Sequence, residues 1–453
     1  MPFSTLHQHA LTIFQAGVKA ADPSDAIQRS MWVENGSLYF RLKTVNSNTY
    51  RNGLWSKVHI IAFGKAAVSM TRAVQNILRA AKIDFQSLVV TNDENFPEYC
   101  EFPVLPASHP LPDQRGLNAA LRIVEQLSQT QAGELVLVLI SGGGSALIPL
   151  PISPVTLADK SITTDLLLAS GATIQEINCV RKHLSQLKGG RLTQLAMPAA
   201  VHALILSDVI GDDVSAIASG TTVADESTYQ QALEILQNYQ IVTRVPESVI
   251  QLITQGCQGK YPETAKKADP VLIDNDYTII GSNILSLQAS VEAAKNLGFD
   301  TSIYHSALTG IAREVAEQWV LQLKFLINKG INQATALLAG GETTVKLQPN
   351  SGLGGRNQEF ALAFAIAAER HRLPKIWTLL AAGTDGRDGM TTAAGAIIDA
   401  NSIENMFSLG FDPIQHLENH NAFPILQAAN NLVITGATAT NVADLQIVLL
   451  QPK

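Results

Sequence analysis

Short apolar runs alternate along the chain with longer segments of helical periodicity. The runs at 58–63, 135–140 and 201–206 are apolar almost throughout and rich in branched side chains. That composition is typical of strands buried on both faces of a sheet. Segments with helical spacing follow, such as the one that Asp113 can cap and that extends to about residue 130. The alternation predicts an α/β protein with a parallel sheet.

The same alternation restarts in the second half, after a loose polar stretch that contains Gly256, Gly259, Pro262 and Pro270. Further strands are predicted at 277–280, 299–304, 334–339, 376–382 and 445–450, with helices between them. Glycine and proline interrupt helices and strands, so a stretch rich in both marks a boundary. We therefore expect two α/β domains, residues 1–260 and residues 261–453.

The run at 135–140 leads directly into a glycine-rich loop made of Ser141, Gly142, Gly143, Gly144 and Ser145. Glycine lacks Cβ, so this loop can turn sharply and a ligand can approach its backbone. Consecutive N–H groups and two hydroxyls favour binding of a phosphate or carboxylate, although a plain tight turn has the same composition. The loop matches neither a Walker loop nor a dinucleotide fingerprint, so neither of those folds follows from it.

Other predicted strands also end in glycine and a charged residue. Lys65 follows the strand at 58–63, and Asp208 follows the strand at 201–206. Parallel strands bring such ends to one edge, and two such edges facing each other would form a cleft. Lys65 also suits a solvated position at a helix start. Asp212 and Asp213 suit helix capping better than chemistry.

A predicted helix over 173–187 carries a cationic edge. Arg181 and Lys188, with His183 as a third candidate, could share one side of it and bind a substrate carboxylate. A solvated charged face explains the same residues equally well.

Composition and charge exclude several classes of protein. The 453 residues are 46% hydrophobic and 16% charged, with a formal net charge of −7. A nucleic-acid-binding protein usually carries a basic face, and no run approaches the length of a membrane span. Cys100, Cys179 and Cys257 lie far apart, which excludes a zinc pattern and favours a reducing cytoplasm. The first 23 residues lack the apolar core of a signal peptide.

Several motifs in order resemble class II glycerate kinases, the family often named for its C-terminal MOFRL domain. They are GKAA, SGGGSAL, RKHLSQLKGGRL, SDVIGDD, GGETTV, GGRNQEFAL and AAGTDGRDG, and the match extends from about residue 62 to 444. The resemblance implies an N-terminal Rossmann-like parallel sheet, a separate C-terminal α/β domain and an active site between them. It implies ATP-dependent phosphorylation of D-glycerate, usually at the 2-hydroxyl, with a divalent cation such as Mg²⁺.

Roles are assigned from this resemblance and from chemistry. Lys65, Arg356 and the loop from Ser141 to Ser145 would bind donor phosphates, with Glu342 and Thr384 as further candidates for the nucleotide site. Asp208 would accept the hydroxyl proton or hold Mg²⁺. Glycerate carries a carboxylate that suits the fork of Arg191 or Arg356, and Asp385 is a second candidate for the substrate site.

The sequence departs from the family pattern at Ser108, Thr221 and Thr392, and its loop at 435–441 lacks a usual proline and glycine. These departures could alter the substrate range. Two other functions stay open at this point: an NAD(P)H-dependent hydroxypyruvate reductase, and a nucleotide-binding module without turnover. The expected partners are D-glycerate and ATP, without nucleic acid or membrane, for a monomer or homodimer.

Overall fold

A computed structural model describes residues 3–374 and 376–452. The chain divides into two compact units. Unit 2 contains Pro23–Ser207 and Asp212–Ile280, and unit 1 contains Asp208–Gly211 and the described parts of Met1–Asp22 and Gly281–Lys453. The division thus falls at 280/281 instead of the expected 260/261, and the N-terminal segment groups with the C-terminal half. Each unit is described by itself.

Unit 2 is built on a seven-stranded sheet in the order β3-β10-β9-β8-β5-β6-β7. Its strands are β3 (Lys43–Thr44), β5 (Val58–Phe63), β6 (Phe85–Asn92), β7 (Val104–Ala107), β8 (Leu135–Ile140), β9 (Ala200–Leu206) and β10 (Asn275–Gly281). The neighbours β9, β8, β5, β6 and β7 pair in parallel, as do β10 and β3. Every residue of β5 and β8 is buried, which confirms the pattern of strands covered on both faces.

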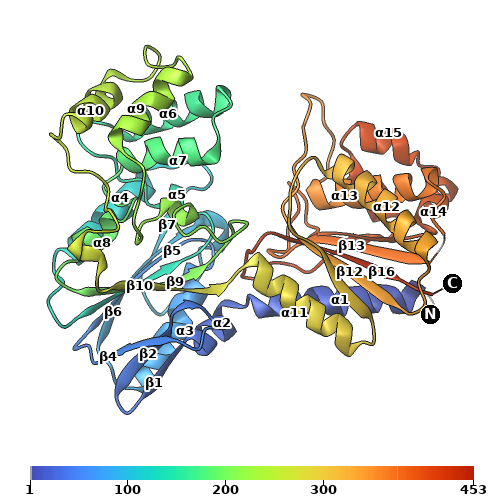
Figure 1. Ribbon diagram of the computed structural model, residues 1–453, viewed down its shortest axis with the longest axis horizontal. Helices are drawn as coiled ribbons and strands as arrows, with labels where there is room; N and C mark the ends of the chain where they lie inside the picture. Colours follow the sequence, from blue (N-terminus) through green and yellow to red (C-terminus); the bar gives the residue numbers. More distant parts are fainter. Residues whose placement is uncertain (1–2, 375, 453) are drawn as a thin grey trace. The chain divides into compact units, whose positions relative to one another are not determined.

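The helices of unit 2 are α2 (Pro23–Ser30), α3 (Ala67–Ala80), α4 (Gln114–Leu127), α5 (Gly144–Leu147), α6 (Leu157–Ala169), α7 (Ile174–His183), α8 (Arg191–Leu195), α9 (Tyr229–Asn238) and α10 (Glu247–Cys257). Asp113 caps α4 as predicted, by accepting a hydrogen bond from the N–H of Gly116. Helices α6, α7, α9 and α10 share a hydrophobic cluster of their own (Figure 1). An antiparallel sheet of β1 (Met31–Glu34), β2 (Ser37–Arg41) and β4 (Tyr50–Gly53) completes the unit.

Unit 1 contains a six-stranded sheet in the order β11-β12-β16-β13-β14-β15. The strands are β11 (Asp300–Leu308), β12 (Thr335–Gly341), β13 (Trp377–Gly383), β14 (Gly395–Asp399), β15 (Leu432–Val433) and β16 (Asp444–Leu450). Only the β11–β12 pair is parallel among the pairs of this sheet, and the other four are antiparallel. The expectation that aligned parallel strands bring their ends together is therefore wrong for this unit.

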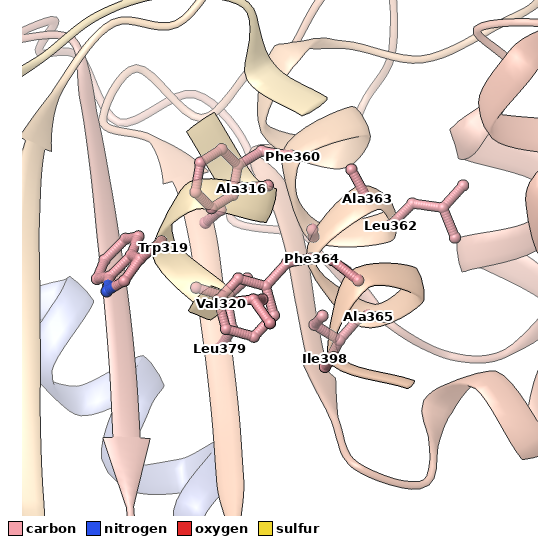
Figure 2. Packing of buried hydrophobic residues seen from close by; sticks show 14 of the residues in the cluster. Ala316, Trp319, Val320, Phe360, Leu362, Ala363, Phe364, Ala365, Leu379 and Ile398 are labelled. Carbon is pink, nitrogen blue, oxygen red and sulfur yellow. The ribbon is translucent and has the colours of Figure 1, made fainter. Parts of the chain in front are cut away.

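Helices cover both faces of this sheet (Figure 1). One face packs against α12 (Ala312–Lys329), α13 (Arg356–Arg370), α14 (Ser402–Ser408), α15 (Pro413–Glu418) and α16 (Ala422–Ala428). Figure 2 shows part of this core, in which the rings of Trp319 and Phe364 lie 6.5 Å apart, edge to face. Along β12, Leu337 and Ala339 belong to this core, whereas Ala336 and Leu338 belong to the opposite one. The alternation follows from the two-residue period of a strand.

The opposite face is covered by α1 (Phe3–Ala20) and α11 (Asn283–Asn296), which share a core with the strands. The periodicity predicted α1 correctly, with Leu6, Ile13 and Phe14 on its buried face. This apolar face needs an apolar partner, and the sheet of unit 1 provides one. The expected domain of residues 1–260 thus includes α1, whereas this helix packs within unit 1.

Gly17 permits the close approach of α1 to α11 and β16. A Cβ on Gly17 would lie 2.6 Å from Cδ1 of Leu445 and would also collide with Oγ of Ser290. We expect Gly17→Val to lower the free energy of unfolding by about 2 kcal/mol, because overpacking forces the helix off the sheet. The control is Gln15→Val, which puts the same side chain on the exposed face of α1. Equal melting temperatures for the two variants would contradict this packing.

None of the helices in the described residues has both the length and the apolar character that crossing a membrane requires.

Candidate active site

The first group of candidate residues lies in unit 2, where the parallel strands β5 and β8 end side by side. Phe63 is paired with Ile140 in the register of the two strands, so the residues that follow them emerge together. The N–H of Lys65 donates to the carbonyl of Gly142 at 2.9 Å, and the N–H of Ala66 donates to Oγ of Ser141 at 3.0 Å. The structure thus brings Lys65 to the glycine-rich loop, as the sequence predicted.

Two glycines make this arrangement possible. Gly64 has φ +126°, and a Cβ there would collide with Ser141. Gly143 has φ +84°, in the left-handed region that favours glycine. A Cβ on Gly143 would lie 2.9 Å from Cδ2 of His109. Burial, together with the charge of Lys65, lowers the pKa of His109. Sequence analysis had not singled out this histidine.

The end of the loop is surrounded by cations. Oγ of Ser145 accepts hydrogen bonds from Nη2 of Arg181 at 2.8 Å and from Nζ of Lys188 at 2.9 Å. Nζ of Lys188 also donates to the carbonyl of Ser145 at 2.8 Å. The predicted cationic edge therefore reaches the loop through Arg181 and Lys188. His183 is not part of it, because its ring is buried between the carbonyl of Cys179 and the carboxylate of Glu263.

Arg191 begins α8 but is only 7% exposed. Its guanidinium donates to the carbonyls of Ser185 and Pro262 and to the hydroxyl of Tyr229, at 2.8–3.2 Å. These contacts connect segments of unit 2, and burial leaves little of the fork for a ligand. The geometry argues against the predicted substrate role of Arg191. A pattern of charges in the sequence cannot distinguish an arginine that is buried for structural reasons from one that binds a ligand.

The second group of candidate residues lies in unit 1, around the first residue of β16. Asp444 is paired with Gly341 at the end of β12 and with Gly383 at the end of β13. The antiparallel strand β16 thus places its beginning between the ends of its two neighbours. Glu342 and Thr384, which follow those ends, are brought to either side of Asp444. Sequence analysis missed Asp444, because its role depends on this register.

Arg356, the first residue of α13, forms a bidentate ion pair with Asp444. Its Nε and Nη2 atoms lie 2.6 and 2.8 Å from the carboxylate oxygens, and its Nη1 lies 3.2 Å from Oε1 of Glu342. Asp444 is fully buried, whereas the side chain of Arg356 is 29% exposed. Burial opposes the charge of Arg356, but Asp444 and then Glu342 raise its pKa above the ordinary value. The guanidinium is thus a fixed positive charge with one partly exposed edge.

The carboxylates around this arginine influence one another. Partial burial raises the pKa of Glu342, Arg356 opposes the change, and the charges of Asp444, Asp208 and Asp385 add to it. Asp208 belongs to the segment that groups with unit 1. Oδ1 of Asp385 accepts a hydrogen bond from the N–H of Arg387 at 3.0 Å. Arg356, Asp208 and Asp385 thus all influence the charge of Glu342, and the assignment of these four residues to one site stays a prediction.

Thr384 and Asp213 serve the backbone around them. The buried hydroxyl of Thr384 donates to the carbonyl of Ala443 at 2.7 Å and accepts from the N–H of Val442 at 2.9 Å, which braces the start of β16. These bonds argue against a nucleotide contact for the Thr384 side chain. Asp213 accepts from the N–H of Ser215 in a turn. The expected helix cap is wrong, because only a short 3-10 turn at Ile217–Ser219 follows.

Asp388 explains part of the GGRNQE motif. Its buried carboxylate accepts hydrogen bonds from the N–H groups of Asn357 and Gln358 at 3.1 and 2.8 Å, in the first turn of α13. Burial raises the pKa of Asp388 to about 6, against the opposing effect of these bonds. Asp388 therefore fixes the start of the helix that presents Arg356.

A cavity of about 600 Å³ opens beside this cluster within unit 1. Its lining includes Glu342, Arg356, Glu359, Met390 and His420. Glu359 and His420 are joined at 2.7 Å, and Arg313 contacts Glu359 at 2.9 Å. Among the described residues, no group of three or more His, Cys, Asp or Glu side chains is arranged to hold a metal ion.

Comparisons with known proteins place the chain in a family. Residues 9–254 match the domain of unknown function DUF4147, and residues 335–444 match the MOFRL family. A glycerate 2-kinase of Pyrococcus horikoshii is 36% identical over 450 residues, which cover 99% of this chain and 98% of that protein. A protein of Agrobacterium vitis named putative hydroxypyruvate reductase is 39% identical over 398 residues, with 86% of this chain and 98% of that protein covered.

The solved structures agree with this assignment. The crystal structure of a glycerate kinase from Thermotoga maritima superimposes with a TM-score of 0.83 at 35% identity, and covers 99% of this chain and all of that one. The chain therefore belongs to the MOFRL family of glycerate kinases.

Proposed function

We propose that this protein transfers the terminal phosphoryl group of ATP to D-glycerate and forms 2-phosphoglycerate. The chain is 36% identical to a glycerate 2-kinase over nearly the whole of both proteins, and this similarity carries the proposal. The two groups of residues supply the chemistry that the reaction needs. Phosphoryl transfer depends mainly on positioning and on stabilisation of charge, and each group combines fixed cations with rigid backbone.

Donor phosphates would bind at the glycine-rich loop of unit 2. Lys65 lies beside the loop, because its backbone N–H donates a hydrogen bond to the carbonyl of Gly142. Backbone N–H groups and a lysine are the combination that binds phosphate in many nucleotide-binding loops. Gly143 has no side chain, so a phosphate could approach its backbone closely, and a larger residue there would also strike His109.

Substrate chemistry would use the cluster of unit 1. The edge of Arg356 that Asp444 leaves exposed can meet the glycerate carboxylate or a phosphate oxygen. Asp208 would accept the hydroxyl proton of glycerate, as a general base in hydrogen-bond reach. If Asp208 is not the proton acceptor, Glu342 and Asp385 are the remaining candidates for that role. His183 is no longer a candidate, because its ring is buried against Glu263.

A divalent cation fits these carboxylates. Mg²⁺ prefers oxygen ligands and usually takes one or two protein carboxylates together with substrate phosphates. In the alternative in which Asp208 holds the cation and does not accept the proton, Glu342 would be the second ligand, because the charge of Asp208 already acts on its pKa. When bound, Mg²⁺ would neutralise charge on the transferring phosphoryl group.

The alternative function, reduction of hydroxypyruvate with NAD(P)H, has the names of two relatives in its favour. The glycine-rich loop lacks the fingerprint of dinucleotide-binding proteins, which argues against it. A module that binds nucleotide without turnover has no need of the carboxylate cluster.

The test supplies purified protein with D-glycerate, ATP and Mg²⁺, and reads the position of the new phosphate by ³¹P NMR. In parallel, hydroxypyruvate and NADH are supplied, and NADH oxidation without kinase activity would contradict the proposal.

A comparison of two nearby aspartates tests the proton acceptor. Asp208→Asn keeps the shape but removes the charge, so turnover should fall by about 10²-fold, the usual scale for a lost general base. Asp213→Asn should change turnover little, because asparagine can accept the same turn hydrogen bond from Ser215. Both rates are measured at saturating Mg²⁺, together with melting temperatures. Similar rates for the two variants would transfer the role to Glu342 or Asp385.

A further inference from the structure

Two cationic side chains of unit 2 contact the end of the glycine-rich loop, and a third interacts with both through its charge. We call Lys160 of α6, Arg181 of α7 and Lys188 the buried cationic cluster. Lys160 is 6% exposed and Lys188 is 1% exposed, while Arg181 is half-buried. Burial lowers the pKa of both lysines, the charge of Arg181 lowers both further, and the charge of Lys160 adds to the effect on Lys188.

The cluster has no acidic counter-charge in the part of the chain that the structure describes, where no carboxylate lies within ion-pair distance of these three residues. Two acidic side chains of the same unit already have other partners. Asp225 pairs with Lys182 at 3.2 Å, and Asp159 accepts from the N–H of Thr156, the N-cap of α6, and from Ser248 of α10 at 2.9 Å. Nζ of Lys160 is buried without any hydrogen-bond partner. Burying an unpaired ammonium group is costly, so the arrangement is unfavourable unless an anion joins it.

Two members of the cluster donate to the end of the loop. Arg181 and Lys188 both donate to Oγ of Ser145. Neither side chain can accept a hydrogen bond, so the hydroxyl proton of Ser145 is directed to Oγ of Ser219, at 2.9 Å. Ser219 in turn donates to Oδ1 of Asn178 at 3.1 Å. Ser145 and Arg181 are the members of this arrangement with partial exposure, so a ligand would reach the cluster on their side.

We propose that the buried cationic cluster is the counter-charge for a phosphate group bound at Ser145. A phosphate offers several acceptor oxygens and up to two negative charges, which suits three interacting cations better than the single charge of a carboxylate. Lysines bind phosphate as point charges, without the planar geometry that a carboxylate fork requires. The inference rests on the proposed kinase function for the source of the phosphate, which would be the nucleotide.

A change of protonation should accompany this binding. Burial and then the charge of Arg181 lower the pKa of Lys160 to about 7, and burial lowers the pKa of Lys188 as well. A bound phosphate favours the protonated lysines, so binding takes up protons when the pH is above about 7. The affinity for phosphate should therefore weaken as the pH rises from 7 to 9. Arg181 stays charged over this range.

The test measures ADP binding by titration calorimetry for the wild type and for Lys160→Met, which keeps the length of the side chain and removes its charge. We expect the affinity for ADP to fall about 30-fold, the scale of a hydrogen bond to a charged group. The number of protons taken up on ADP binding should also be smaller in Lys160→Met than in the wild type. It is obtained from titrations at pH 8 in buffers with different heats of ionisation. Lys260→Met, at an exposed position of the same unit, is the control that should bind normally.

Melting temperatures separate this role from a structural one. Removing an unpaired buried charge should leave the melting temperature of Lys160→Met unchanged or raise it. A lower melting temperature with normal ADP affinity would overturn the proposal and make the cluster structural. Arg181→Gln is a second variant, at a half-buried position, and should weaken ADP binding in the same way. Normal ADP affinity in both variants would also overturn the proposal.

Titrations with other ligands identify the source of the anion. D-glycerate should bind both variants as it binds the wild type, because it carries no phosphate. Loss of D-glycerate affinity alone would show that the cluster binds a carboxylate, against the proposal. If the wild type binds ADP through the cluster but phosphorylates no D-glycerate, the kinase function fails and the anion site stands.

Discussion

Replacement of Lys65 by alanine is expected to slow D-glycerate phosphorylation by about 10³-fold and to leave the protein folded. Removing one fixed donor from a site that stabilises developing charge costs on this scale. Lys65 follows the buried strand β5, and the bond from its N–H to Gly142 sets the position from which its side chain extends. The side chain itself is only partly buried, so little packing is lost with it.

The matched control is Lys57→Ala, one residue before β5 begins, where Nζ donates to Oε1 of Gln86 at 3.1 Å. Rates of both variants are measured with saturating ATP, together with their melting temperatures. Lys65→Ala should also raise the pKa of His109, since the charge of Lys65 helps to lower it, and NMR titration of that histidine reports this directly. A folded Lys65→Ala protein with normal turnover would remove Lys65 from the donor site.

Asp444→Asn is expected to reduce turnover by a similar factor, although Asp444 itself is too deeply buried to meet a substrate. The change removes the charge that holds Arg356 by two hydrogen bonds of 2.6 and 2.8 Å. Breaking a buried ion pair costs several kcal/mol, and the partial exposure of Arg356 reduces this to about 2 kcal/mol of stability. The released guanidinium would no longer be held at the end of β12, beside Glu342.

Kinetics distinguish positioning from a general loss of stability. At a temperature where the variant is fully folded, kcat should still be low, and Arg356→Lys should show the same defect because lysine keeps the charge without the fork. Asp300→Asn, an exposed aspartate at the start of β11, is the control. If Asp444→Asn and Asp300→Asn have equal kcat values, the ion pair with Arg356 has no part in the reaction.

Local sequence patterns determined most of the elements and the first half of the candidate site. Branched apolar runs predicted β5, β8 and β9, because a strand buried on both faces needs apolar residues throughout. The parallel arrangement of unit 2 then followed from the helices between these strands. Neighbouring parallel strands end at one edge, so the contact between Lys65 and the glycine-rich loop could be expected although the two are far apart along the chain. The pairing of β5 with β8 brings them together.

Only the tertiary structure decided which distant residues share an environment. The pairing of β16 between β12 and β13 places Asp444 beside Arg356, and an apolar run does not specify its neighbours or their direction. The amphipathic pattern of α1 specifies a buried face but not the sheet that covers it. Charged residues are equally ambiguous. Arg191 is buried and connects segments of unit 2, while Lys160, which no motif marked, is buried with no hydrogen-bond partner for its Nζ among the described residues. In each case the deciding interactions join segments far apart in the chain, and their energies depend on burial and on partners that local periodicity does not encode.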